Sequence, residues 1–192
     1  MENNTVFDRL TTVVKEMGAK NAAVIPADLI ELDASFRDSC AANYCGVYGK
    51  CWMCPPDVGD IHKLMDDVRT YDYVLVYQTI GELEDSYDVE GMHEAGTAHN
   101  KIAHRLKAEF TSAAGCDIES LHLGAGGCRV CAVCAKRTNE PCRFPDKAMS
   151  SLEAYGINVY KMAEASGMKY INGVNTVTYF GAVFFRLPSS EE

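Results

Sequence analysis

The stretch Tyr73-Val74-Leu75-Val76-Tyr77 is an almost continuous apolar run, and the fold prediction starts from it. Strands of parallel sheets, which are buried on both faces, have this composition. A helical pattern follows over about residues 90–114, and its inward stripe consists of Ala95, Ala98, Ile102, Leu106 and Phe110. The short run Leu121-His122-Leu123 comes next. The order strand, helix, strand predicts a right-handed crossover and parallel pairing of the two strands.

The sequence on either side of this unit extends the pattern. Apolar residues at helical spacing predict helices over residues 5–17 and 61–68, with a strand at residues 22–25 that ends at Pro26. Towards the C-terminus we expect a helix over residues 146–164 with a break near Gly156. Two strands, residues 168–171 and 177–186, should follow, joined by a turn at Asn172-Gly173. We therefore predict one α/β domain over residues 1–192, with a mixed, largely parallel sheet flanked by helices and two cysteine-rich loops.

Composition and charge restrict the class of protein. With 47% hydrophobic and 23% charged residues, the 192-residue chain is typical of a globular protein with its own core. A formal charge of −9 argues against nucleic acid as a partner, because phosphate binding needs a concentrated basic face. The N-terminus lacks a cationic start followed by an apolar run, and no stretch is long enough to span a bilayer. We expect a cytoplasmic protein that does not bind membranes.

Cysteines are the most informative residues for function. Apart from Cys116, the nine cysteines fall into two groups: Cys40, Cys45, Cys51 and Cys54, and then Cys128, Cys131, Cys134 and Cys142. The second group has the spacing C-x2-C-x2-C-x7-C. In a cytoplasmic chain with an odd number of cysteines, this grouping favours metal binding over disulfides.

The spacing of the second group favours iron–sulfur chemistry. Iron–sulfur clusters are held by four thiolates, and short x2 steps let neighbouring sulfurs reach different irons. Structural zinc usually takes two separated pairs of ligands instead, so the third cysteine, Cys134, favours iron. The spacing differs from that of bacterial ferredoxins, so either Cys142 or a distant thiol completes this site. We expect one or two iron–sulfur clusters of the [4Fe–4S] type, because each group supplies four thiols. Zinc is the alternative, and disulfides or free thiols are the third interpretation.

The surroundings of the cysteines fit an anionic centre. Gly124, Gly126 and Gly127 precede Cys128 and would allow backbone amides to approach sulfur, or would simply form a strand-to-loop turn. Basic residues that would offset cluster charge are Arg129, Lys136, Arg137 and Arg143. We also expect helix N-termini to face the cysteines, one near Asp146 and one after Cys54-Pro55-Pro56. His99 lies on the apolar side of the long helix, and we expect a semi-buried residue with satisfied hydrogen bonds rather than a metal ligand.

A set of motifs gives the chain a family resemblance. They are Cys45-x2-Tyr48-Gly49-x2-Trp52-x-Cys54-Pro55-Pro56, Gly127-Cys128-x2-Cys131-x2-Cys134, Pro141-Cys142-Arg143-x-Pro145 and Ser151-x3-Tyr155-Gly156-Ile157. Together they resemble a domain-of-unknown-function family described as predicted cysteine-rich metal-binding proteins. The resemblance covers most of the chain and implies metal binding, without any assigned reaction. It supports Cys40, Cys45, Cys54, Cys128, Cys131, Cys134 and Cys142 as metal ligands. Cys51 stands where the family is expected to have a polar residue, so it is left out of the predicted set.

These observations lead to a functional hypothesis with an alternative. We expect an iron–sulfur protein that transfers electrons or supports the reductive chemistry of a redox partner protein; the oligomeric state is left open. The alternative is a structural zinc site in a scaffold or interaction module. An enzyme is a third hypothesis: the sequence contains no Ser/His/Asp arrangement, Walker loop or paired carboxylates, so catalysis would depend on a metal that lacks one cysteine ligand.

Overall fold

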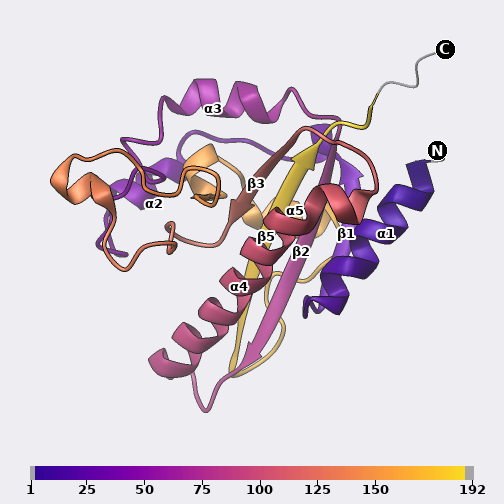
Figure 1. The fold of residues 1–192 in the computed structure, drawn as a ribbon. Helices are drawn as coiled ribbons and strands as arrows, with labels where there is room; N and C mark the ends of the chain where they lie inside the picture. The colour runs from indigo at the N-terminus through magenta and orange to yellow at the C-terminus, as the bar shows by residue number, and fades with distance from the viewer. Residues whose placement is uncertain (1–2, 189–192) are drawn as a thin grey trace.

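The computed structural model describes residues 3–188, and Figure 1 shows their arrangement. The helices are α1 (Asn3–Glu16), α2 (Phe36–Ala41), α3 (Ile61–Val68), α4 (Val89–Ala114) and α5 (Val159–Ala165). The strands are β1 (Asn21–Pro26), β2 (Tyr73–Glu82), β3 (Ser120–Gly124), β4 (Ser150–Ser151) and β5 (Thr176–Phe185). Short 3₁₀ helices are η1 (Ala27–Leu29), η2 (Ala135–Thr138) and η3 (Glu153–Tyr155). No helix within residues 3–188 has the length and apolar character needed to cross a membrane.

The sheet is mixed, but it is not largely parallel as predicted. Its five strands lie in the order β1-β2-β5-β3-β4. β1–β2, β2–β5 and β5–β3 are antiparallel pairs, and only the short β3–β4 pair is parallel. The predicted crossover from β2 through α4 to β3 exists, and because both strands are antiparallel to β5 they run in the same direction. They do not pair, since β5 lies between them.

Burial on both faces explains why β2 resembles a strand of a parallel sheet. Val74 and Val76 pack into the core with α3 and α5, whereas Leu75 and Tyr77 face the core with α1 and α4. An internal strand that is covered by helices on both faces points apolar side chains to both, whatever the direction of the neighbouring strands. The apolar run therefore indicates double-sided burial rather than parallel pairing.

The predicted helices are confirmed in the first two thirds of the chain, with a change in the inward face of α4. Leu106 and Phe110 are buried as expected, but Ala98 is exposed and the neighbouring His99 is fully buried. The Nδ1 atom of His99 lies 3.0 Å from the Thr79 hydroxyl, and its ring stacks on Tyr77. His99 is a core residue of the sheet and its helix.

The C-terminal third differs from the prediction. The helix expected at residues 146–164 is replaced by β4, η3 and the shorter α5. The chain turns at Gly156, which has the left-handed φ of 73° and whose carbonyl accepts a hydrogen bond from the amide of Asp33. The strand expected at residues 168–171 does not form, and the Lys169 carbonyl in this segment accepts hydrogen bonds from the side chains of Gln78 and Asn172, each at 3.0 Å.

Both cysteine-bearing segments lie together to one side of the sheet (Figure 1). We call residues 36–58 and 125–148 the cysteine lobe. The first segment comprises α2 and the turns before α3. The second segment, which includes η2, connects β3 to β4, so the sheet edge positions it directly.

Candidate metal centre

Side-chain and main-chain contacts join the two segments of the cysteine lobe. The Trp52 indole Nε1 donates a hydrogen bond of 2.8 Å to the Glu140 carbonyl. The Lys136 ammonium forms a largely buried ion pair of 2.5 Å with Asp57 and lies 4.3 Å from the centroid of the Trp52 ring. These contacts hold residues 51–57 against residues 136–140 and bring thiols from the two segments together.

The first cavity of the lobe is small and is lined mainly by thiols and apolar groups. Its volume is about 20 Å³. It is lined by Cys51, Cys128, Cys131, Cys134 and Cys142, together with Trp52, Met53, Val130, Phe144 and Ala148. No histidine or carboxylate side chain lines it. We call it the closed cavity.

A second, larger cavity of about 280 Å³ contains the other three cysteines of the lobe. It is lined by Cys40, Cys45 and Cys54, with Ser39, Tyr44, Val47, Tyr48, Pro55, Gly126, Gly127, Ser151 and Glu153. Gly127 is required here by close packing: a Cβ at this position would lie 3.2 Å from the Cys54 sulfur and 3.1 Å from Val47. We call this the open cavity.

The thiols at the boundary between the cavities shift one another's pKa values. The hydrogen bond with Cys128 lowers the pKa of Cys51, but the bond with Cys54 and burial outweigh it and raise this pKa to about 11. The same contact with Cys51, followed by burial, raises the pKa of Cys128. The hydrogen bond from Cys51 lowers the pKa of Cys54. Adjacent thiols cannot all ionise without a nearby cation, so metal binding here would release protons.

Cys40, in α2, has a different environment. Burial is the main cause that raises the pKa of its thiol, and Glu153 and Cys45 add to the effect. The Arg37 guanidinium opposes them and lowers this pKa. Arg37 precedes Cys40 by one helical turn, and its Nε and Nη2 atoms are buried without a hydrogen-bond partner in the described part of the chain.

The seven predicted ligands are thus distributed over two cavities. Cys128, Cys131, Cys134 and Cys142 line the closed cavity, while Cys40, Cys45 and Cys54 line the open one. Cys51, which the resemblance left out, lines the closed cavity and is 4% exposed. The C-x2-C spacing between Cys51 and Cys54 was the sequence feature that could have identified Cys51 as a residue of the site. All nine cysteines are free thiols. Within residues 3–188, no three or more His, Cys, Asp or Glu side chains converge with metal-binding geometry.

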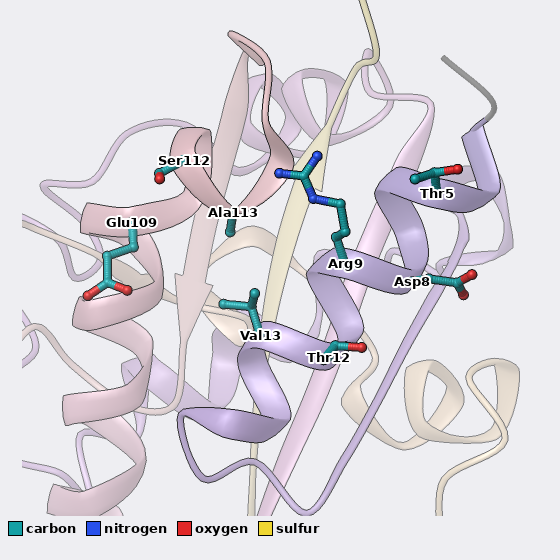
Figure 2. Close-up of a pocket in the computed structure, with 8 residues that line it drawn as sticks. All are labelled: Thr5, Asp8, Arg9, Thr12, Val13, Glu109, Ser112 and Ala113. Carbon is teal, nitrogen blue, oxygen red and sulfur yellow. The ribbon is translucent and has the colours of Figure 1, made fainter.

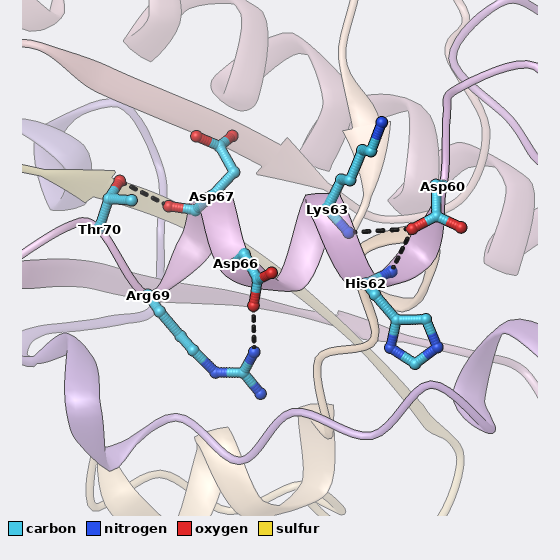
Figure 3. A network of polar contacts seen from close by, with 7 residues as sticks. All are labelled: Asp60, His62, Lys63, Asp66, Asp67, Arg69 and Thr70. Atoms are coloured by element: carbon cyan, nitrogen blue, oxygen red, sulfur yellow. Dashed lines mark hydrogen bonds and ion pairs between the residues drawn. The ribbon is translucent and has the colours of Figure 1, made fainter.

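The predicted helix N-termini do not face the cysteines. Figure 3 shows that α3 begins after Asp60, whose carboxylate accepts the amides of His62 and Lys63, each at 3.1 Å. Asp60, and not Cys54, therefore caps this helix. The helix expected near Asp146 is absent, since residues 144–148 form turns that lead into β4.

Among the predicted basic residues, Lys136 pairs with Asp57 and Arg143 donates to the Val133 carbonyl at 3.2 Å.

Other cavities of the described part of the chain contain no cysteine, and two of them are much larger than the open cavity. A basic cavity of about 690 Å³ is lined by His104, Arg105, Lys107, Ala108, Arg129, Val130, Asp146 and Lys147. It shares Val130 with the closed cavity. The other, of about 530 Å³, lies between α1 and α4, where Figure 2 shows Arg9 and Glu109 on facing helices. With no thiol among its lining residues, the α1–α4 cavity does not belong to the candidate metal centre.

Comparison with known protein families finds a match over most of the chain. A family model described as "Predicted metal-binding protein (DUF2284)" matches residues 23–185. The match extends from β1 to the last residue of β5 and includes both segments of the cysteine lobe. No curated protein and no solved structure matches the chain.

Proposed function

The chain belongs to the DUF2284 family of predicted metal-binding proteins, and from this premise we propose that it is a cytoplasmic iron–sulfur protein that transfers electrons. In this proposal the thiols of the closed cavity hold a [4Fe–4S] cluster. Cys128, Cys131 and Cys134 are ligands, and the fourth is either Cys142 or Cys51.

The observation that carries the proposal is the set of thiols lining the closed cavity. They come from both segments of the cysteine lobe, and the remaining lining residues offer no carboxylate or imidazole. Thiolates are the ligands that iron–sulfur clusters require, and the set supplies more of them than a single four-coordinate zinc ion uses. The donor chemistry of the residues therefore fits the cluster.

The surroundings of the cavity support electron transfer. A bound cluster would supply one-electron chemistry. Trp52, Met53 and Phe144 would limit access of water to it, which is one way in which proteins tune the potential of such centres. The basic cavity next to Val130 offers an acidic redox partner a complementary surface on an otherwise acidic chain.

Metal analysis of anaerobically isolated protein tests the proposal. We expect iron and acid-labile sulfide in equal amounts, and a visible absorbance that decreases on reduction. The double variant Cys131→Ala/Cys134→Ala should lose the part of this absorbance that comes from the cluster in the closed cavity, whereas Cys116→Ala, which removes the cysteine outside both groups, should retain all of it. A colourless protein that cannot be reconstituted with iron and sulfide would eliminate the proposal.

Two single variants identify the fourth ligand. If Cys142 completes the site, Cys142→Ala should reduce cluster content and Cys51→Ala should leave it unchanged. The reverse result would assign the role to Cys51, the thiol contributed by the first segment. Iron content and absorbance of both variants, measured beside Cys116→Ala, distinguish these results.

A structural zinc site is the second candidate, and the size of the closed cavity favours it. A volume of about 20 Å³ accommodates roughly one small atom or ion. Zinc held by four of these thiols would connect the two segments that Trp52 and Lys136 already join. Stoichiometric zinc, with neither iron nor redox-active absorbance, would establish this function in place of the first.

A further inference from the structure

The open cavity is lined by three cysteines, and none of them lines the closed cavity. They are Cys40, Cys45 and Cys54. These cysteines come from α2 and from the turns that follow it, whereas four of the five thiols of the closed cavity come from the segment between β3 and β4. The lobe therefore has enough thiols for two centres.

We propose that Cys40, Cys45 and Cys54 bind a second iron–sulfur centre with one coordination position left open, and that this position takes a small exogenous ligand from the open cavity. The proposal rests on the proposed function, because both sites depend on the same thiolate chemistry. Four thiolates complete a cubane cluster, and this cavity offers three, with no other cysteine or histidine among its lining residues.

The volume of the open cavity is the reason for assigning a ligand to it. At about 280 Å³, compared with about 20 Å³ for the closed cavity, it has room for a small molecule beside the thiols. The hydroxyl groups of Ser39, Ser151 and Tyr48 and the carboxylate of Glu153 line the same space and can donate to or accept from a polar ligand. Metal sites that bind substrates keep such a non-protein position, whereas structural sites are closed.

Two features of the surrounding residues favour an anionic centre at this place. Arg37 precedes Cys40 by one turn of α2, and its Nε and Nη2 atoms are buried without partners in residues 3–188, so a positive charge lies near the Cys40 thiol. Gly127 lacks a side chain where a Cβ would lie 3.2 Å from the Cys54 sulfur. Together they provide charge compensation and space around the sulfur atoms.

The test compares cysteine variants by metal content and by their response to cyanide, a small ligand for iron. Cys45 is exposed, so Cys45→Ala and Cys45→Ser should both fold, with circular dichroism as the check. We expect either variant to lose about half of the iron, as one of two centres disappears. Cys131→Ala/Cys134→Ala should lose the other half, and Cys116→Ala none.

Cyanide should shift the electron paramagnetic resonance signal of the reduced wild type and of Cys131→Ala/Cys134→Ala, but not that of Cys45→Ala.

The outcomes separate this inference from the proposed function. Full iron content in Cys45→Ala and Cys45→Ser, with complete loss in Cys131→Ala/Cys134→Ala, would overturn the second centre and leave the first intact. Loss of iron in the Cys45 variants without any cyanide shift in the wild type would overturn the open position. Iron that is insensitive to all of these variants would overturn both proposals.

Discussion

The sheet with its helices and the cysteine lobe are built from different kinds of residue. The sheet is covered on both faces, and its fully buried side chains include Tyr77, Phe110, Phe184 and Phe185. In the cysteine lobe, the buried residues are small: Cys51, Cys54, Pro55, Ala135 and Ala148. Burial of large apolar side chains stabilises the sheet and its helices. The cysteine lobe relies instead on turns, on its thiols and on the contacts that Trp52 and Lys136 make between the two segments.

This contrast teaches where a metal would matter. A metal centre in the cysteine lobe would cross-link the two segments where little apolar surface is buried. The sheet, in contrast, is stabilised by the hydrophobic cores on its two faces. The two regions should therefore respond to different perturbations, and the predictions below test that independence.

Removal of metal should have the largest effect, and it should be confined to the cysteine lobe. Structural zinc contributes about 10–16 kcal/mol to the folding of zinc-finger peptides, which have little core of their own. We expect a chelator to bring hydrogen exchange of residues 125–148 close to the rate of an unfolded chain, while amides of β2 and β5 stay protected. Mass-spectrometric exchange measures both regions in one sample. Loss of protection in β2 and β5 as well would show that the sheet depends on the metal.

Phe184→Ala should destabilise the whole protein by about 3–5 kcal/mol, because it leaves a cavity in a fully buried part of the core. The matched variant Phe144→Ala removes a phenyl ring that is 44% exposed in the cysteine lobe. Its global unfolding midpoint in urea should stay close to that of the wild type. Equal shifts in the two variants would contradict the proposed separation of the regions.

Acid should weaken the sheet through His99. Burial lowers the pKa of this histidine to about 4, well below its unfolded value near 6.5. Between these values the unfolded chain binds a proton that the native state does not, so stability falls as pH decreases from 6.5 towards 4. The residues around the ring, Tyr77, Thr79 and Tyr179, bear no charge that would stabilise an imidazolium.

His99→Phe tests this assignment, since it keeps a ring at the site and cannot bind the proton. Over this pH range the wild type should lose roughly 3 kcal/mol more than the variant. The measurement is the free energy of unfolding in urea at several pH values. Parallel pH profiles for the two proteins would show that His99 does not contribute. His122, whose pKa burial also lowers, to about 3, should keep a residual slope in both.

Lys136→Met should loosen the cysteine lobe by about 1 kcal/mol, because it removes the ion pair with Asp57 and the cation–π contact with Trp52. Lys161→Met is the matched control, since the Lys161–Glu164 pair is exposed and lies in α5. We expect faster exchange of amides near residues 136–140 in Lys136→Met alone. Unchanged exchange there would mean that Trp52 suffices to hold the segments together.

The sequence predicted the elements of the sheet better than their connections. The apolar runs of β1, β2 and β3 and the periodicity of α1, α3 and α4 depend on local burial, which residue type reports directly. The insertion of β5 between β2 and β3 depends on pairing between distant segments. An apolar strand such as β2 is compatible with either direction, so the largely parallel sheet was the wrong choice.

The cysteine site shows the same division between local and distant information. The spacing of Cys128, Cys131 and Cys134 suffices to bring them to one cavity, because they lie in one turn-rich segment. The separation of Cys51 from Cys54 into the two cavities was not predictable, since the C-x2-C pattern suggests a shared site. Only the packing of the two segments across Trp52 and Lys136 directs these neighbours to different cavities.

Gly127 lies between these two groups of thiols, and Gly127→Ala should have the smallest effect. The added Cβ would lie 3.2 Å from the Cys54 sulfur and 3.1 Å from Val47, so both must shift by a few tenths of an ångström. Gly124→Ala is the matched control, because a Cβ there meets no atom within 4 Å. Competition with a chelator should show metal affinity reduced about threefold in Gly127→Ala, equivalent to roughly 0.6 kcal/mol, and unchanged in Gly124→Ala. Equal affinities in the two variants would mean that the Cys54 sulfur does not need this space, and would weaken the distinction between a closed cavity and an open one that begins at Gly127.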